Sequence, residues 1–290
     1  FIGLYNLLNY FNNRKKYYKD LANAIIVKSI ISAIIQISIG LLKGGVVGLI
    51  SGQLISQMFE NLRLLKNITK DKLLLSKISK IKIIALAKRY NNFPKFSLPG
   101  VLVNVSMVNI TNILVSSFYD IVTLGYYSFA QRMINLPSAI IGGAIGNVYF
   151  QEAAREKEAT GIAIKSFYNV LKKLLLIGLP PFIILFFVVE DIFPFIFGNN
   201  WDIAGKYAKI IIPLSLIQFV VSPLSLAMTV FEKQNICFYW QASMFITTML
   251  IFYCAQYFKM EFNLFLIYLV FFLSLEYLVG LFICYYISKY

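Results

Sequence analysis

Residues 262–287 read FNLFLIYLVFFLSLEYLVGLFICYYI, an apolar run with a single charged side chain, Glu276. A helix needs about 20 mostly apolar residues to cross a bilayer, so this run is long enough to span one. The rest of the chain is similar, because 59% of its 290 residues are hydrophobic and only 14% are charged, against about 25% charged in a soluble domain. The composition therefore predicts an all-α integral membrane protein.

Seven further stretches are apolar enough and long enough to form complete membrane helices. They are Leu21–Leu42, Gly44–Leu65, Phe96–Phe118, Leu124–Phe150, Ile164–Val189, Ala204–Val230 and Cys237–Tyr257. The chain also opens without Met inside an apolar stretch, residues 1–11, which we interpret as the end of a truncated membrane helix. We expect eight complete membrane helices preceded by this stub.

Lys and Arg residues are distributed unevenly over the connecting loops. Of the 27, 21 lie in one set of loops and four in the alternate set, while Lys28 and Arg132 lie within spans. Because cytoplasmic loops carry the excess of basic residues, we expect the first set, and with it the C-terminus, to be cytoplasmic. The net charge of +14 then reflects topology and attraction to anionic lipid, and we expect no nucleic-acid partner.

The longest loop, Lys66–Lys95, combines many lysines with apolar residues spaced three and four apart. This pattern predicts an amphipathic cytoplasmic helix in the headgroup plane, and a solvated linker is the alternative. A weak parallel repeat relates residues 4–65 to residues 222–287, and such repeats build two-lobed transporters. We therefore expect residues 1–65 to end a first lobe, the loop to link the lobes, and residues 96–290 to form a second lobe of six helices, in a twelve-helix protein.

Signatures of enzymes and metal sites are missing from the sequence. There is no His, which excludes His-ligated metals and Ser-His-Asp triads. The three Cys residues lie in apolar runs without CxxC spacing, and no phosphate-binding loop appears. We expect no catalytic residue, no metal and no cofactor, apart from a coupling H⁺ or Na⁺.

Charged side chains at membrane depth are candidates for a transport site, because they are costly in lipid. Arg132, about eight residues into its span, is expected to line a cavity, with snorkelling to the surface as the alternative. Lys28, about seven residues into its span, could equally snorkel. Glu276 should be protonated, paired or hydrated, either as a hydrogen bonder to a neighbouring helix or as a site for the coupling ion. Asp120 lies at an outer turn, where we expect it to be solvated; a displacement of one turn would bring it over the cavity mouth, so it is also a candidate for substrate binding.

The span Phe96–Phe118 carries a stripe of amides. Asn104 and Asn112 are eight residues apart and share a helix face, and such a stripe must face protein or water. These amides are candidates for binding sugar hydroxyls, with contacts between helices as the alternative.

Small residues recur at every fourth position in two other spans. One row is Gly44, Gly48, Gly52 and Ser56, and the other is Ser138, Gly142 and Gly146. Rows of this kind predict close helix packing.

Two stretches resemble bacterial polysaccharide flippases. Residues 90–104, YNNFPKFSLPGVLVN, are similar to the start of the second lobe of these proteins, and residues 124–150, which contain LGYYSFAQRM and IGNVYF, resemble their eighth span. The family is that of the repeat-unit (Wzx-type) flippases, in the multidrug/oligosaccharidyl-lipid/polysaccharide superfamily. The resemblance covers essentially the whole chain and implies that it runs from the fourth to the last of twelve spans.

The resemblance implies a transporter that moves an undecaprenyl-pyrophosphate-linked oligosaccharide, such as an O-antigen repeat unit, to the outer leaflet of the bacterial inner membrane. Polysaccharide assembly proteins would be its partners. It also implies a cationic cavity for the pyrophosphate and acidic sugars. Gln131 and Arg132 fall in the eighth-span motif and are assigned to this cavity, whereas Lys28 lies in a cavity-lining span but matches no motif.

Two other functions stay open. A drug or cation antiporter of the same superfamily would favour acidic residues in its cavity. A membrane polymerase or glycosyltransferase would need a large outer loop or a catalytic acidic motif.

Overall fold

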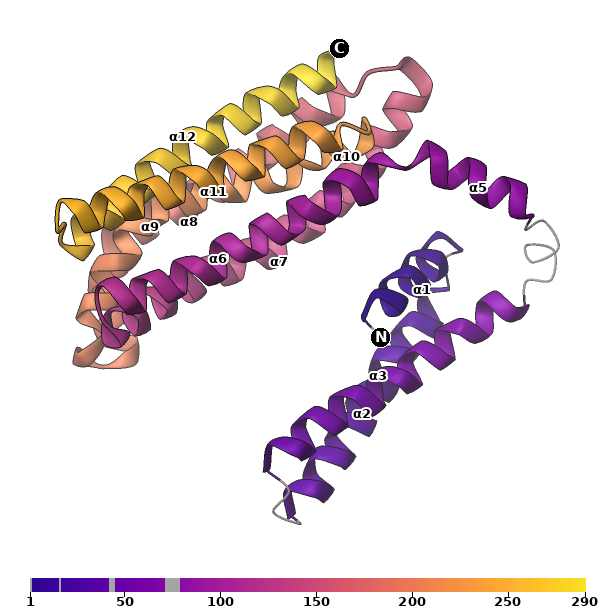
Figure 1. Ribbon diagram of the computed structural model, residues 1–290, viewed down its shortest axis with the longest axis horizontal. Helices are drawn as coiled ribbons and strands as arrows, with labels where there is room; N and C mark the ends of the chain where they lie inside the picture. Colours follow the sequence, from indigo (N-terminus) through magenta and orange to yellow (C-terminus); the bar gives the residue numbers. More distant parts are fainter. Residues whose placement is uncertain (1, 16, 42–44, 71–78) are drawn as a thin grey trace. The chain divides into compact units, whose positions relative to one another are not determined.

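The computed structural model describes residues 2–15, 17–41, 45–70 and 79–290, and every regular element in these ranges is helical. This confirms the all-α prediction. Lys43, Gly44 and the middle of the expected linker helix, residues 71–78, lie outside the described residues. The chain divides into two compact units, Phe1–Lys88 and Arg89–Tyr290, whose helices are labelled in Figure 1.

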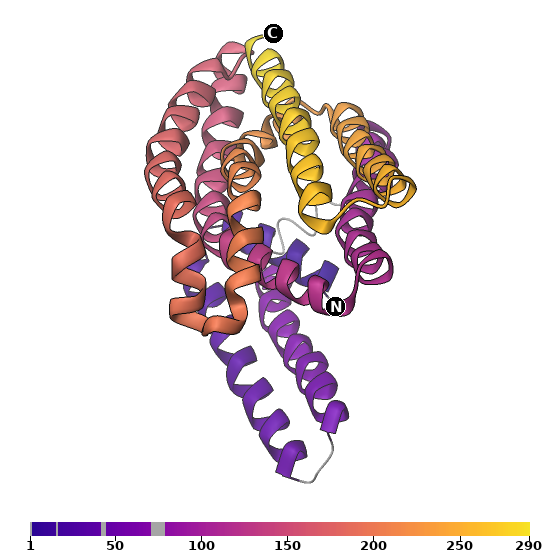
Figure 2. The ribbon, with the colours of Figure 1, turned by 90° about the vertical axis from the view of Figure 1, so that its left-hand side faces the viewer.

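The first unit contains four described helices. They are α1 (Ile2–Arg14), α2 (Tyr18–Leu41), α3 (Gly45–Lys70) and α5 (Lys80–Arg89). α2 and α3 run side by side in opposite directions (Figures 1 and 2). Gly52 makes this approach possible, because a Cβ atom there would lie only 2.6 Å from Gln36 Cγ. Gly48 and Gly52 of the predicted row therefore pack against α2.

Seven described helices are long and apolar enough to cross a membrane. α3 is not among them, although Gly44–Leu65 was expected to be an eighth span. Its length suffices, but Gln53, Gln57, Glu60 and Asn61 reduce its apolar character. Gln57, Glu60 and Asn61 are buried within the first unit, so this helix places much of its polar sequence against protein.

The second unit is a bundle of six long helices (Figure 2). They are α6 (Leu98–Phe118), α7 (Ile121–Thr160), α8 (Ile164–Phe197), α9 (Asp202–Leu224) with its short extension α10 (Leu226–Val230), α11 (Gln234–Tyr257) and α12 (Phe262–Lys289). α9 is the most buried of the spans and packs against α7, α8 and α12. α6 packs against α7 and α11, and α11 also contacts α12.

An aromatic cluster around Phe262 joins four of these helices. The rings of Tyr119, Tyr127 and Tyr207 lie 5.1, 5.9 and 4.8 Å from the Phe262 ring, all in edge-on geometry. Edge-on aromatic pairs contribute about 0.5–1.5 kcal/mol each beyond the area that they bury. The cluster therefore positions the starts of α7, α9 and α12 and the end of α6.

The described part of the loop Lys66–Lys95 is largely helical. It comprises the end of α3, the helix α5, and a π-helical turn, Phe93–Ser97, that leads directly into α6. No residue of α5 is buried. Its location at a membrane surface stays a prediction.

Candidate functional site

A cavity of about 200 Å³ lies inside the second unit, between α6, α7, α9, α11 and α12. Its polar lining consists of Asn104, Thr111, Asn112, Tyr127, Gln131, Asn135, Gln218, Thr248 and Tyr277. The structure thus brings together three residues that the sequence proposes for substrate binding, Asn104, Asn112 and Gln131. The lining contains no charged side chain, so the cavity offers only neutral hydrogen-bonding groups.

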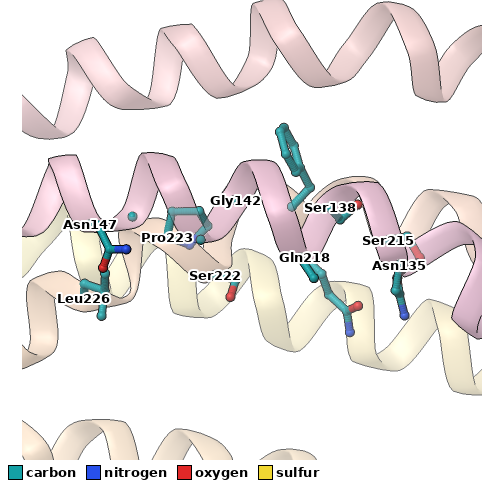
Figure 3. A pocket seen from close by; sticks show the side chains of 13 residues that line it. Asn135, Ser138, Gly142, Asn147, Ser215, Gln218, Ser222, Pro223 and Leu226 are labelled. Atoms are coloured by element: carbon teal, nitrogen blue, oxygen red, sulfur yellow. Dashed lines mark hydrogen bonds between the residues drawn. The ribbon is translucent and has the colours of Figure 1, made fainter. Parts of the chain in front are cut away.

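A second cavity, of about 460 Å³, lies between α7 and the α9–α10 segment (Figure 3). Its polar lining consists of Asn135, Ser138, Asn147, Ser215, Gln218 and Ser222. Asn135 and Gln218 line both cavities, so the two adjoin. Sequence reasoning missed every polar residue of the second cavity except Ser138, which it treated as a packing residue. The four-residue spacing of Asn135 and Gln131 could have revealed the continuation of the polar face.

Small residues on α7 form this second cavity. A Cβ atom on Gly146 would lie 3.3 Å from Leu226 Cδ1 and 3.6 Å from Pro223 Cα, so the glycine lets α7 approach α9 closely. A Cβ atom on Gly143 would have no neighbour within 4 Å, because this glycine faces the open part of the cavity. Gly142 and Gly146 of the predicted row therefore bring the two helices together, and Gly143, which is not part of the row, leaves space beside them.

Several polar groups of the second cavity have no protein partner. Ser215 Oγ donates a hydrogen bond to Asn135 Oδ1 over 2.9 Å. Ser138 Oγ is buried without a hydrogen-bond partner, and Asn147 makes no side-chain hydrogen bond to any residue that the structure describes. Buried polar groups are normally satisfied by protein or water, so Ser138 is available to a polar ligand, whereas Asn147 is exposed at the open side of the cavity.

Arg132 lies outside both cavities. Its side chain is exposed and forms no ion pair with the described part of the chain. It follows Gln131 on α7 and lies seven residues before Ala139 and eleven before Gly143, which line the second cavity. At 3.6 residues per turn these three residues share a helix face, and Arg132 is about 10 Å along the axis from Ala139. Arg132 was expected to line a cavity. In the structure it lies beside the second cavity and is not part of the lining of either.

Lys28 is paired within the first unit. Its Nζ lies 2.9 Å from Oε2 of Glu60 and 5.3 Å from the centre of the Tyr5 ring. The Glu60 side chain is 1% exposed and that of Lys28 is 31% exposed. Sequence reasoning missed Glu60, although it lies in an expected span and the argument applied to Lys28 would have identified it. The structure therefore gives Lys28 a structural partner.

Glu276 accepts two hydrogen bonds from the neighbouring helix α11. Ser243 Oγ donates to its Oε2 over 2.5 Å and Thr247 Oγ1 to its Oε1 over 2.6 Å. Trp240 Nε1 donates to the backbone oxygen of the same residue over 2.9 Å. These contacts match the structural alternative for Glu276, and they do not test ion coupling. Groups of three or more Cys, Asp or Glu that could hold a metal ion do not occur among the described residues.

Asp120 caps the start of α7. Its Oδ1 accepts a hydrogen bond of 2.6 Å from the backbone N–H of Thr123, and its Oδ2 accepts one of 2.8 Å from the Thr123 hydroxyl. These hydrogen bonds lower the pKa of the Asp120 carboxyl below its ordinary value. The side chain is exposed and lines neither polar cavity, so its contacts are those of a helix N-cap.

Comparison with known protein families gives a match that extends over both units. A family model described as polysaccharide biosynthesis protein matches residues 1–205, a range that includes α1 to α8 and the residues of α6 and α7 that line the cavities. No curated protein and no solved structure matches the chain. Since the family model covers well over half of its residues, this multi-pass helical membrane protein belongs to the polysaccharide biosynthesis protein family.

Proposed function

We propose that the protein is a flippase that moves an oligosaccharide linked to undecaprenyl pyrophosphate from the cytoplasmic to the outer leaflet of the bacterial inner membrane, by alternating access. Membership of a polysaccharide biosynthesis family supports this role. The observation that carries it is the neutral polar lining of the adjoining cavities in an otherwise apolar bundle. Amides and hydroxyls at membrane depth are costly unless paired, and sugar hydroxyls can pair with them as donors and acceptors.

Arg132 is the residue that we assign to the pyrophosphate. A guanidinium stays charged at physiological pH and matches phosphate oxygens with two parallel donors. Arg132 is exposed, and no described carboxylate neutralises it. Lys28 is already paired with Glu60, so we assign it to the stability of the first unit instead.

The orientation and the partners belong to the same proposal. The excess of Lys and Arg in one set of loops supports a cytoplasmic C-terminus. The lipid bilayer surrounds the bundle, and polysaccharide assembly proteins receive the translocated glycan.

The two alternative functions, an antiporter and an enzyme acting on sugar chains, are less well supported by the linings of the two polar cavities. An antiporter of drugs or cations would use carboxylates, and neither polar cavity has a carboxylate in its lining. An enzyme acting on sugar chains would need a catalytic acid or base, and no such group lines these cavities.

Glu276 is the candidate for a coupling ion within this proposal. If it carries the coupling proton, Glu276→Gln should abolish the dependence of flipping on the pH gradient at normal protein abundance. An unchanged pH dependence would show that Glu276 serves only to bind α11 through Ser243 and Thr247.

The proposal is tested by reconstituting the full-length protein in vesicles and following a labelled undecaprenyl-pyrophosphate oligosaccharide. Arg132→Ala should slow flipping at least tenfold, because a hydrogen bond to a charged group contributes about 1.5–3 kcal/mol. Arg132→Lys should be slowed less, since it keeps the charge. Arg155→Ala, at another exposed arginine of α7, is the matched control and should flip normally. Full activity of a well-expressed Arg132→Ala would refute the site assignment, and no flipping by the wild type would refute the proposed function.

A further inference from the structure

We infer that the cavity between α7 and α9 is a binding subsite for an uncharged sugar of the transported glycan, adjacent to the arginine assigned to the pyrophosphate. This inference rests on the proposed function and narrows its substrate class. The resemblance to flippases implies a cationic cavity suited to acidic sugars, whereas the lining of this cavity carries no charge.

The size and chemistry of the cavity fit a sugar. Its volume of about 460 Å³ lies within the range of about 300–1,000 Å³ typical of small-molecule sites. Amide and hydroxyl side chains project from both helices (Figure 3). Because amides and hydroxyls both donate and accept hydrogen bonds, they can match neutral sugar hydroxyls and acetamido groups in either direction.

The same cavity also offers an apolar wall. Phe219, Pro223 and Leu226 line the α9–α10 side. A pyranose ring has apolar C–H surfaces between its hydroxyl groups, so it needs such a wall as well as polar partners. A site lined by apolar groups with a few placed polar groups is the usual design of a ligand pocket.

Unpaired polar groups indicate where the ligand would bind. Ser138 Oγ is buried without a hydrogen-bond partner, and Asn147 makes no side-chain hydrogen bond to the chain as described. A buried polar group that lacks a partner is destabilising. A bound sugar hydroxyl would satisfy Ser138, which lies on the same helix as Arg132, while Asn147 is exposed and nine residues further along, so that it could contact only another part of the ligand.

The absence of charge in the lining sets the selectivity. A uronic acid in this cavity would place a carboxylate against amides, hydroxyls and apolar groups, with no Lys or Arg among the lining residues to pair with it. An unpaired buried charge is far more costly than a buried hydroxyl that has hydrogen-bond partners. The cavity should therefore exclude acidic sugars.

The position of Arg132 matches the covalent structure of such a substrate. The first sugar of a lipid-linked glycan is bonded directly to the pyrophosphate, so the two groups must bind close together. Arg132 lies seven residues before Ala139 of the cavity lining, about 10 Å along the helix axis and on the same face. One face of α7 can thus hold the anion at Arg132 and the neutral glycan from Ala139 onward, with Gly143 a further turn, about 6 Å, along the axis.

Two glycines of α7 provide a matched pair for the test. A Cβ atom added at Gly143 or at Gly125 would meet no atom within 4 Å, so both positions tolerate a side chain. Gly143 lines the cavity and Gly125 does not. Gly143→Leu therefore fills the subsite, while Gly125→Leu makes the same chemical change elsewhere on the helix.

The experiment measures binding and flipping of three undecaprenyl pyrophosphates by the full-length protein. The first carries a neutral disaccharide of hexose and N-acetylhexosamine, the second has a hexuronic acid next to the pyrophosphate, and the third has no sugar. The wild type should bind the neutral probe at least tenfold more tightly than the uronate. Gly143→Leu should lose at least tenfold in affinity for the neutral probe without losing affinity for the sugar-free lipid, and Gly125→Leu should bind all three as the wild type does.

The failures of the two proposals are distinguishable. If the wild type flips the neutral probe but Gly143→Leu binds it equally well, or if the uronate binds as tightly as the neutral probe, the subsite is refuted and the flippase stands. If the wild type flips none of the three lipids, the proposed function is refuted, and the subsite with it.

Discussion

Replacing Lys28 by Met should destabilise the first unit, because it leaves the carboxyl group of Glu60 buried without its partner. The ammonium and carboxylate are 2.9 Å apart, and the Glu60 side chain is only 1% exposed. Met keeps an unbranched side chain of similar length, although the contact of the ammonium group over the Tyr5 ring is also lost. The substitution therefore removes the charge with little change in shape.

The magnitude follows from the unequal burial of the two groups. At an effective dielectric constant of about 20, two unit charges at this distance attract by about 6 kcal/mol, and desolvation of Glu60 opposes this attraction. Breaking a buried pair costs about 3–5 kcal/mol. Because Lys28 is 31% exposed and water screens it, we expect a loss of about 3 kcal/mol, at the lower end of this range.

The reverse change should cost less. Glu60→Gln leaves an ammonium on a flexible stem that can extend toward water, so we expect a loss of about 1 kcal/mol. The double variant Lys28→Met with Glu60→Gln should be more stable than the sum of the single changes predicts, with a coupling energy of about 2 kcal/mol.

The assay is thermal unfolding of the full-length protein in detergent for the wild type, both single variants and the double variant. Lys19→Met, at an exposed lysine of α2, is the control and should change stability by no more than about 0.5 kcal/mol. Additive single effects would refute the ion-pair reasoning. A Lys28→Met variant of normal stability that no longer binds the lipid-linked glycan would restore the substrate role that the sequence first suggested.

Two further predictions concern the second unit. In Gly280→Ala the new Cβ would lie 2.5 Å from Trp240 Cε2, so the ring must move and stability should fall by about 1–3 kcal/mol. Thermal unfolding measures this loss. The control is Gly125→Ala, whose Cβ would have no neighbour within 4 Å, and it should leave the unfolding temperature unchanged or slightly raised. The Asp120 carboxyl has a lowered pKa in the folded protein because Thr123 donates to it, so its contribution is present above the unfolded pKa of about 3.9 and is lost as the pH falls through the folded value. The difference in unfolding temperature between wild type and Asp120→Ala should shrink below about pH 4, and a difference independent of pH would contradict this.

Local sequence was sufficient to predict seven of the eight expected membrane helices, because a single apolar run in lipid satisfies its own backbone groups as a helix. The run at 262–287 is α12, Phe262–Lys289, to within two residues. Helix ends were less predictable. α7 continues to Thr160, ten residues beyond the predicted Phe150, because it ends at Gly161, whose φ of 81° terminates the helix. Hydropathy reports where lipid contact ends, whereas capping decides where the helix ends.

Helix periodicity also predicted part of the candidate site. Asn104 and Asn112 share a face of α6 and line one cavity, as their spacing of eight residues implies. Periodicity specifies the face of a helix on which a side chain lies, but it does not specify which other helix covers that face.

The pairing of polar side chains was decided by tertiary structure alone. Lys28 meets Glu60 across α2 and α3, Glu276 meets Ser243 and Thr247 across α11 and α12, and Arg132 stays exposed one position from the cavity-lining Gln131. Each outcome depends on the rotation and contact of helices that are far apart in the chain. The sequence alone determined that this protein is a helical membrane protein with polar groups at membrane depth. The cost of a buried charge or amide depends on the partner that it finds. Only the packing of the helices therefore decided which of these groups support the fold and which line a cavity.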